Sequence, residues 1–384
     1  MSTVTTDAWV LHPGEGAAPV SLVREPFSFP DISEQEVLVE PLYGCWEGNM
    51  AHALERRPID VCRERGEERV VIGNSGVVRV LRAGPAVTTV RTGDVAMVFG
   101  AATWDRHGYT IRAMAYDAPG TMGVLARRMK MHERTLIPLP EDTAHSLPQW
   151  AAFSLRYVTA WSNWRVAHAC WRAQLEEVTP EEMHVFAWGG GVAFAELQLA
   201  RRLGCHCAMV ASRDERLRRI EAEGIEAIDR RAFGALSFEA DRYAEDAGYR
   251  RRYQQAERAF LDLVRDRTRG DGVSVFVDNI GSPVIRATLK ALARCGVVAT
   301  AGWKLGMNVT LLRAIECINR HTHVHTHYAR PQEGREAIEF AERTGWMAPV
   351  PDRVYRWEEI PELAEDFACG RLDTFFPVFA VNGE

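Results

Sequence analysis

The residues best suited to chemistry form a glycine-rich turn near the middle of the chain: Gly189, Gly190, Gly191 and Val192. A compact apolar stretch, 183–188, precedes the turn, and residues 193–203 follow it with apolar side chains at helical spacing. Glycines between a strand and a helix let the backbone approach a pyrophosphate, whose charge the helix N-terminus then stabilises. We therefore predict a dinucleotide site here. A structural glycine turn is the alternative, because Phe194 stands where a third small residue is expected.

A second group of polar residues follows the next apolar stretch, 208–211: Ser212, Arg213 and Arg216. Enzymes that use NAD usually carry an acidic residue at this point, which binds the ribose hydroxyls, whereas an arginine accommodates the 2′-phosphate of NADP. The two arginines therefore predict NADPH as the cofactor, although Asp214 lies between them. The alternative is the solvated start of a surface helix.

The elements that must position these residues differ between the two halves of the chain, with short strands first and alternating strands and helices later. Residues 7–100 read as short strands separated by turns, which indicates a partly closed sheet or barrel. From about residue 148 strands and helices alternate, which is typical of a parallel α/β sheet. We predict a catalytic domain over 1–155, closed by 333–384, and a nucleotide-binding domain over 156–332. The charged stretch 231–268 is interpreted as added helices on the second domain.

Length and composition narrow the class of protein. The 384 residues suit two domains, and the net charge of -6 gives no reason to expect nucleic acid or an anionic membrane surface. No stretch approaches the roughly 18 apolar residues that a membrane span needs, and residues 1–6 lack the pattern of a secretory signal. The eight cysteines are scattered, which favours reduced thiols and a cytoplasmic protein.

A longer motif in the first domain carries a family resemblance. Val71 to Val78, followed by Gly84 and by Gly93-Asp94-Val95, resembles the signature of the medium-chain dehydrogenase/reductase superfamily. The resemblance implies an α/β fold with a doubly wound Rossmann sheet and a GroES-like, partly open β-barrel. The zinc-dependent members begin this signature with Gly-His-Glu, whereas this chain has Gly73-Asn74-Ser75 and lacks a cluster of four cysteines. We therefore expect no metal at either usual zinc site.

Within the superfamily, the chain is most similar to the crotonyl-CoA carboxylase/reductase group. The similar segments are Ile228 to Arg231, Phe276 to Gly281, Val298 to Gly302 and His327 to Ala329. The resemblance implies hydride transfer from NADPH to the β-carbon of an enoyl thioester, on CoA or an acyl carrier protein, with CO2 trapped at the α-carbon in the carboxylating members. It also implies a homodimer or homotetramer, paired through the nucleotide-domain sheet.

The same resemblance assigns roles to individual residues. Thr159, Asn279 and Gly302 are implied as further contacts of the cofactor. Four residues match the catalytic pocket of the group: Asn49, Tyr116, Asp117 and His327. Each of the first three has a structural alternative, as a turn-forming amide, a packed ring and a turn acid. The group carries Glu where this chain has Asp117, and the shorter side chain would displace a bound molecule by about an ångström, a shift that can cost ~100-fold in rate.

Three hypotheses remain open: a metal site formed by four histidines, and two alternative functions. His321, His323, His325 and His327 alternate, so that a strand would place them on one face. Neighbouring side chains of that face are ~7 Å apart, which is too far for two of them to share a metal without distortion. For the function, the alternatives to an enoyl-thioester reductase are a quinone or enone reductase that acts on free small enones, and a non-catalytic binding protein in which Phe194 has impaired the glycine turn.

Overall fold

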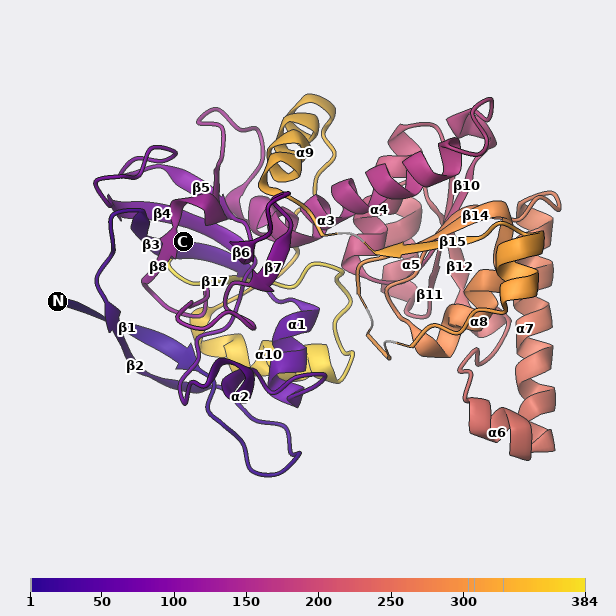
Figure 1. Ribbon diagram of the computed structural model, residues 1–384, viewed down its shortest axis with the longest axis horizontal. Helices are drawn as coiled ribbons and strands as arrows, with labels where there is room; N and C mark the ends of the chain where they lie inside the picture. Colours follow the sequence, from indigo (N-terminus) through magenta and orange to yellow (C-terminus); the bar gives the residue numbers. More distant parts are fainter. Residues whose placement is uncertain (1, 303, 307, 327, 384) are drawn as a thin grey trace. The chain divides into compact units, whose positions relative to one another are not determined.

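The structure is a computed structural model that describes residues 2–302, 304–306, 308–326 and 328–383. The chain forms two compact units, of which the first contains Met1–Val158 and Ala329–Glu384 and the second contains Thr159–Tyr328 (Figure 1). The boundary falls within one long helix, α3 (Leu147–Arg172). No helix in the described part of the chain is long and apolar enough to cross a membrane.

The first unit is built on a seven-stranded sheet with the order β16-β17-β3-β4-β5-β9, to which β8 adds by pairing with β3. All pairs are antiparallel except β16 with β17. The strands are β3 (Glu36–Cys45), β4 (Gly76–Ala83), β5 (Val95–Val98), β8 (Met129–His132), β9 (Leu136–Pro138), β16 (Val354–Tyr355) and β17 (Val378–Ala380). The C-terminal strand β17 pairs with β3, so that residues far apart in the sequence share one sheet.

Smaller elements surround this sheet. Two hairpins are formed by β1 (Thr3–Val10) with β2 (Val23–Pro30) and by β6 (Ala101–Trp104) with β7 (Thr110–Ala113). The helices of the unit are α1 (Gly48–Glu55), α2 (Val61–Arg65), α9 (Pro331–Thr344) and α10 (Ile360–Ala368). The strands β3 and β4 approach closely at Gly44 and Gly76, where a Cβ on Gly76 would lie 2.5 Å from the Tyr43 carbonyl oxygen.

The second unit contains a six-stranded parallel sheet with the order β12-β11-β10-β13-β14-β15. Its strands are β10 (His184–Trp188), β11 (His206–Ala211), β12 (Glu226–Asp229), β13 (Val273–Val277), β14 (Leu292–Thr300) and β15 (His323–Thr326). The chain runs from β10 to one edge, returns to β13 and continues to the other edge. This is the strand order of a doubly wound Rossmann sheet, so the predicted fold class is confirmed.

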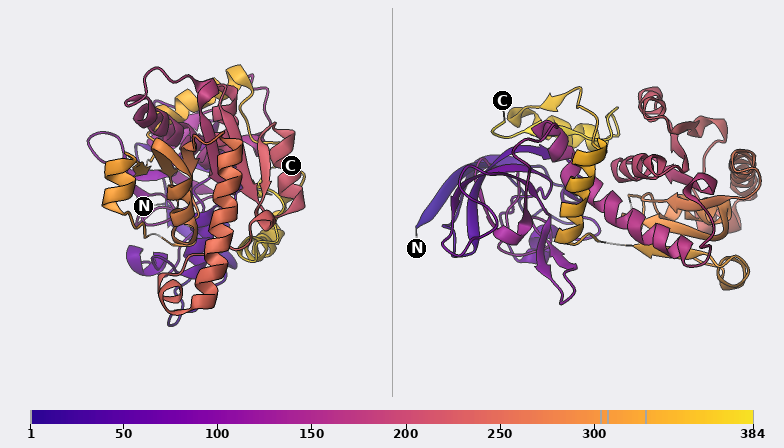
Figure 2. Two further views of the ribbon diagram at one scale, coloured as in Figure 1. Left: turned by 90° about the vertical axis from the view of Figure 1, so that its right-hand side faces the viewer. Right: turned by 90° about the horizontal axis from the view of Figure 1, so that it is seen from above.

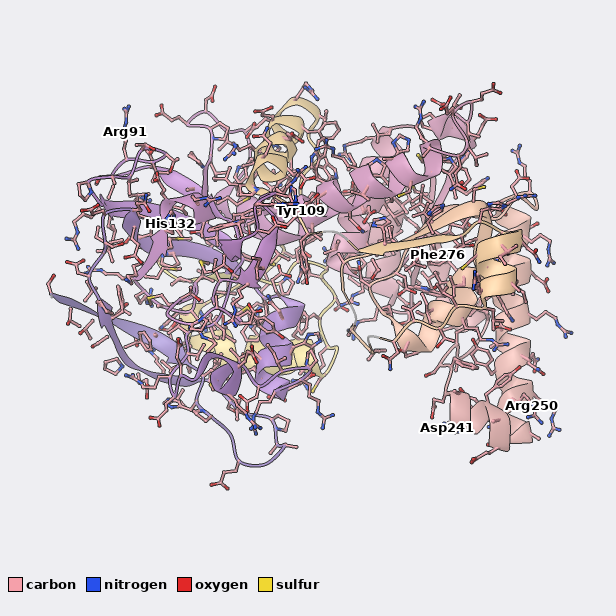
Figure 3. All side chains as sticks on the ribbon, in the orientation of Figure 1. Arg91, Tyr109, His132, Asp241, Arg250 and Phe276 are labelled. Carbon is pink, nitrogen blue, oxygen red and sulfur yellow. The ribbon has the colours of Figure 1, made fainter. Side chains whose placement is uncertain are left out.

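Helices cover both faces of this sheet, because the crossovers reverse direction after β12 (Figure 2). Helices α4 (Gly191–Arg202) and α5 (Asp214–Ala222) join the first three strands, and α8 (Ser282–Ala291) joins β13 to β14. The charged stretch after β12 contains α6 (Ala240–Glu245) and α7 (Ala247–Arg267). Figure 3 shows Asp241 and Arg250 on these two helices, remote from Phe276 in the sheet.

Helix α7 packs against the sheet through its apolar face. Its buried residues recur every three or four positions: Tyr249, Tyr253, Ala256, Phe260 and Val264. The Phe260 ring packs 5.0 Å from the Trp188 ring, and Trp188 in turn lies 5.4 Å from Phe276. This aromatic contact anchors the end of β10, which is the strand that leads into the glycine turn.

The expectation that four alternating histidines lie in one strand is wrong for His321. This residue has φ 54°, a left-handed conformation that does not continue an extended strand, and β15 begins at His323. His323 and His325 lie within the strand, and His327 lies outside the described residues.

Candidate functional site

The predicted glycine turn joins β10 directly to α4. Gly189 and Gly190 are the only two residues between Trp188 and the first helical residue, Gly191. Gly190 has φ 153° and ψ 156°, which L side chains rarely adopt, and a Cβ on Gly189 would lie 3.2 Å from the Val210 carbonyl oxygen. Both positions therefore favour glycine, so these two residues have no side chains that could cover the backbone of the turn.

The N-terminus of α4 has the properties of an anion site. The first hydrogen bond within the helix runs from the Phe194 N–H to the Gly190 carbonyl oxygen, at 2.9 Å. The N–H groups of Gly191, Val192 and Ala193 precede it, and Gly190 has no side chain with which to cap them. A pyrophosphate fits this arrangement, because N–H donors and the helix dipole both favour negative charge there.

Phe194 does not separate the helix from the sheet. Its side chain is fully buried, as are those of Ala193 and Ala195, and α4 contacts both β10 and β11. A bulky side chain at position 194 is therefore compatible with contact between the helix and both strands.

The carboxyl end of β11 is rich in guanidinium groups. Ser212 is exposed directly after the strand, Arg213 is the N-cap residue of α5, and Arg216 lies in the first turn of that helix. Arg231 forms ion pairs with Asp214, at 2.5 Å, and with Asp229, at 2.8 Å. The acidic residue that complicates the sequence prediction is thus already paired with an arginine.

Sequence reasoning missed Arg231. It follows β12, whose end lies at the same edge of the sheet as the end of β11, because the two strands are parallel and pair through Ala211 and Asp229. The signal available in the sequence was the Asp-Arg-Arg run that follows the apolar Ile228. The edge of the sheet where β11 and β12 end therefore carries more positive than negative side chains.

Asn279 and Gly302 lie together at the ends of β13 and β14. The Asn279 Oδ1 atom accepts a hydrogen bond from the Ala301 N–H at 2.8 Å, and a Cβ on Gly302 would lie 3.7 Å from the Asn279 Cβ. The Asn279 Nδ2 atom is shielded from solvent and has no partner among the described residues. This donor and the bare glycine turn fit a dinucleotide. Thr159 is half-buried on α3.

A buried acid lies on the helix that follows the turn. Glu196 and Asn163 are both fully buried, and the Asn163 Nδ2 atom donates to the Glu196 Oε2 atom at 3.0 Å. Burial raises the pKa of Glu196 to about 8, and the bond from Asn163 only partly offsets this effect. At neutral pH the carboxyl group is therefore mostly protonated, so that no negative charge develops behind the glycine turn.

In the first unit, Asn49 lies in the first turn of α1 and has an unexpected partner. Its Nδ2 atom donates to the Oδ1 atom of the buried Asn74 at 3.0 Å. Asn74 is the middle residue of the segment Gly73-Asn74-Ser75, where it orients a neighbouring amide. The Asn49 Oδ1 atom is shielded from solvent and has no partner among the described residues.

Two of the other predicted catalytic residues, Tyr116 and Asp117, take part in core packing and in a turn. Tyr116 is half-buried and packs against the core of the first unit. The Asp117 Oδ1 atom accepts a hydrogen bond from the Ala113 N–H at 2.6 Å, which closes the turn after β7. One carboxylate oxygen of Asp117 is thus committed to the backbone. His327 lies outside the described residues.

A buried ion pair, which sequence reasoning missed, holds the start of α1. The Arg156 Nε atom donates to the Glu47 Oε2 atom at 2.8 Å, and its other nitrogens donate to the carbonyl oxygens of Trp46 and Phe375. Glu47 is the N-cap residue of α1, two positions before Asn49. Burial also raises the pKa of the neighbouring Cys45 thiol, which keeps it protonated.

Replacing the buried arginine should destabilise the first unit. In Arg156→Met, the carboxylate of Glu47 loses its cation while it remains buried, which typically costs about 3–5 kcal/mol. Urea unfolding measures this cost. The double variant Arg156→Met/Glu47→Gln removes both charges and should recover part of it. A free energy of unfolding for Arg156→Met within about 1 kcal/mol of the wild type would show that the pair does not hold the unit together.

Glu196 should make stability depend on pH. Its pKa rises from 4.5 to about 8 on folding, so between these values the folded state holds a proton that the unfolded state has lost. Stability should therefore fall as the pH rises through this window, by up to about 1.4 kcal/mol per pH unit. Glu196→Gln should remove this slope and be the more stable protein at pH 9, whereas the exposed control Glu221→Gln should keep it. Equal slopes in the wild type and Glu196→Gln, from urea unfolding at several pH values, would contradict the assignment.

Comparison with known proteins bears on the fold. No protein family model matches the chain. Over 235 residues, or 60% of the chain, it is 26% identical to the mycoketide-CoA synthase of Mycobacterium tuberculosis, and the chain spans only 4% of the length of that relative.

Solved structures match over nearly the whole chain. Crotonyl-CoA carboxylase/reductase AntE in complex with NADP has a TM-score of 0.81 at 21% identity, and the match covers 99% of this chain and 95% of that one. The 2-octenoyl-CoA carboxylase reductase CinF, in complex with NADP and 2-octenoyl-CoA, has a TM-score of 0.81 at 20% identity, with coverage of 99% and 88%. An alcohol dehydrogenase from Aeropyrum pernix has a TM-score of 0.74 at 19% identity, with coverage of 97% and 99%. The chain therefore has the fold of the medium-chain dehydrogenases/reductases, as its motifs predict.

Proposed function

We propose that the protein is an NADPH-dependent oxidoreductase that reduces the carbon–carbon double bond of an α,β-unsaturated acyl thioester. The observation that carries the proposal is the bare turn of Gly189 and Gly190 at the N-terminus of α4, which lies between the ends of β11 and β13 in the sheet. Support also comes from the likeness in fold to two carboxylase/reductases that were solved with NADP.

The preference for NADPH over NADH follows from charge. The acid at the end of β11, Asp214, is paired with Arg231 and so competes poorly for the ribose hydroxyls. Ser212, Arg213 and Arg216 are assigned to a 2′-phosphate, which carries about two negative charges and accepts several hydrogen bonds. Gly189, Gly190, Gly191 and Val192 are assigned to the pyrophosphate. Thr159, Asn279 and Gly302 are assigned to the other nucleoside.

Bound NADPH supplies the hydride for the β-carbon, and the protein must stabilise the charge that then develops on the thioester oxygen. We assign this role to the hydroxyl group of Tyr116 in the first unit. Asn49, whose Nδ2 atom donates to Asn74, is assigned to accept a hydrogen bond from the nicotinamide or the substrate through its Oδ1 atom. The bond from Asn49 to Asn74 holds the Asn49 side chain in one orientation before a ligand arrives. A donor aimed at the developing charge, the role assigned to Tyr116, typically contributes about 3–4 kcal/mol to the transition state.

Reductive carboxylation is the second candidate, and the likeness to the carboxylase/reductases favours it. Asp117 and His327 would then line the CO2 pocket. Against it stands the hydrogen bond from Ala113 to Asp117, which commits one carboxylate oxygen to a turn. We therefore propose protonation of the α-carbon as the main outcome. The alternatives of a quinone or enone reductase and of a non-catalytic binding protein enter the tests.

The carrier and the assembly are parts of the same proposal. The thioester is carried by CoA or by an acyl carrier protein, and the units act as a catalytic domain and a nucleotide-binding domain. We expect a cytoplasmic homodimer or homotetramer, for which light scattering of the purified protein is the measurement. All eight cysteines are unpaired, as reduced thiols would be.

The decisive experiment compares substrates. Purified protein with NADPH is offered crotonyl-CoA, octenoyl-CoA, the matching carrier-bound thioesters and free quinones, each with and without bicarbonate. Oxidation of NADPH should be fastest with an enoyl thioester, and mass spectrometry should find the saturated acyl product. A carboxylated product would establish the second candidate, and faster turnover of quinones would overturn both. NADPH binding without turnover of any substrate would favour the non-catalytic alternative.

Reversing one charge at the end of β11 should change the choice of cofactor. Arg213→Glu would place a carboxylate against the 2′-phosphate, and the loss of a charged hydrogen bond of about 1.5–3 kcal/mol corresponds to ~10- to 150-fold weaker NADPH binding. NADH binding should change little, because NADH lacks that phosphate. Arg218→Glu, at an exposed position of the same helix, is the matched control. Equal losses for both cofactors, measured by fluorescence titration, would show that Arg213 does not read the phosphate.

A further inference from the structure

Three buried side chains of the second unit form a continuous chain of hydrogen bonds. Trp188 ends β10, Thr288 lies within α8, and Asp278 directly follows β13. The Trp188 Nε1 atom donates to the Thr288 Oγ1 atom at 2.7 Å, and this hydroxyl donates to the Asp278 Oδ2 atom at 2.8 Å. Their exposed fractions are 4%, 0% and 2%, so the chain is closed to water.

The direction of the chain is fixed by the number of protons. An indole N–H can only donate, so the Thr288 oxygen must accept from Trp188, and it has a single proton of its own to give. The Val284 carbonyl oxygen lies farther away, at 3.2 Å, than the carboxylate. A carboxylate is also the stronger acceptor, so the proton of Thr288 points to Asp278.

The second oxygen of Asp278 fixes the loop that follows β13. The Oδ1 atom accepts hydrogen bonds from the N–H groups of Ile280 and Gly281, each at 3.0 Å. Gly281 has φ 97°, and a Cβ there would lie 2.1 Å from the Gly306 carbonyl oxygen. The loop therefore has little freedom, and the residue it encloses is Asn279.

Asn279 presents one donor that no described residue uses. Because its Oδ1 atom accepts from Ala301, its Nδ2 atom must point away from that backbone. This atom is shielded from solvent and has no partner among the described residues. A buried donor without an acceptor costs about 1–3 kcal/mol, a cost that a ligand acceptor would remove.

The sheet order indicates which part of a dinucleotide would supply that acceptor. In the order β11-β10-β13, the glycine turn after β10 lies between the two neighbours. The adenosine half of a dinucleotide lies toward the end of β11. The nicotinamide half must then lie toward the end of β13, where Asn279 is.

We propose that Trp188, Thr288 and Asp278 are positioning residues, which hold Asn279 so that its Nδ2 atom donates to the nicotinamide half of NADPH. This inference rests on the proposed use of NADPH. It adds that the binding of the cofactor depends on a side chain of α8, Thr288, which hydrogen-bonds to Asp278 rather than to Asn279 or the cofactor.

The test is a titration of NADPH fluorescence, performed on the full chain at a temperature at which circular dichroism shows every variant to be folded. Thr288→Val keeps the shape of the side chain but removes the hydroxyl, and should weaken NADPH binding about ten-fold or more. Thr288→Ser restores the hydroxyl and should restore binding. Leu289→Ala, a buried neighbour on α8, is the control for general destabilisation of this helix. It should bind NADPH as the wild type does.

A double-variant cycle shows whether the chain acts through Asn279. Asn279→Ala alone should weaken binding, and adding Thr288→Val to it should weaken binding no further. Additive losses, or equal losses in Thr288→Val and Leu289→Ala, would overturn the inference while leaving NADPH use intact. A wild-type protein that binds no NADPH would overturn the proposed function, and this inference with it.

Discussion

A single guanidinium group buried in the first unit ties together segments that are remote in the sequence. Arg156, on α3, donates to Glu47, to the carbonyl oxygen of Trp46 and to that of Phe375 in the C-terminal segment. Removing such a cation from water is expensive, and only the complete set of acceptors offsets the cost. The geometry is therefore nearly all-or-none, because a partial set of acceptors would leave a charge stranded in the core.

The second unit uses neutral donors for the same purpose. The indole of Trp188 and the hydroxyl of Thr288 lead to the one carboxylate, Asp278, that the loop after β13 surrounds with N–H groups. In each unit, then, a buried polar network includes a residue close in sequence to an amide with a polar atom that no described residue pairs: Glu47 lies two positions before Asn49, and Asp278 directly precedes Asn279. Hydrogen bonds of this kind hold the backbone next to each amide, and rigid support is what a binding amide requires.

Most of the fold could be predicted from the sequence, because short local patterns specify its strands, helices and turns. Alternating strands and helices, with glycines after Trp188, predict the doubly wound sheet, and the arginines after β11 follow from strand endings alone. The side-chain partnerships are different. Arg156 is separated from Glu47 by 109 positions, so nothing local in the sequence joins them. From the sequence, Asp117 could equally be a catalytic residue or a turn-forming residue. Only the backbone geometry around Ala113 reveals its hydrogen bond. The environment of Phe194 likewise depends on how α4 packs on the sheet, which spacing does not specify.

The pair between Arg231 and Asp214 differs from these networks in one respect, which is that it lies in water. Both side chains are more than half exposed, at 57% and 73%. Dissolved ions screen such a pair over a Debye length of about 8 Å at physiological ionic strength, and they compete with the arginines for a phosphate. In the proposed function, the discrimination between phosphorylated and unphosphorylated nucleotides at this edge would thus be a property of the protein together with its salt, strongest in dilute buffer and progressively weaker as electrolyte is added.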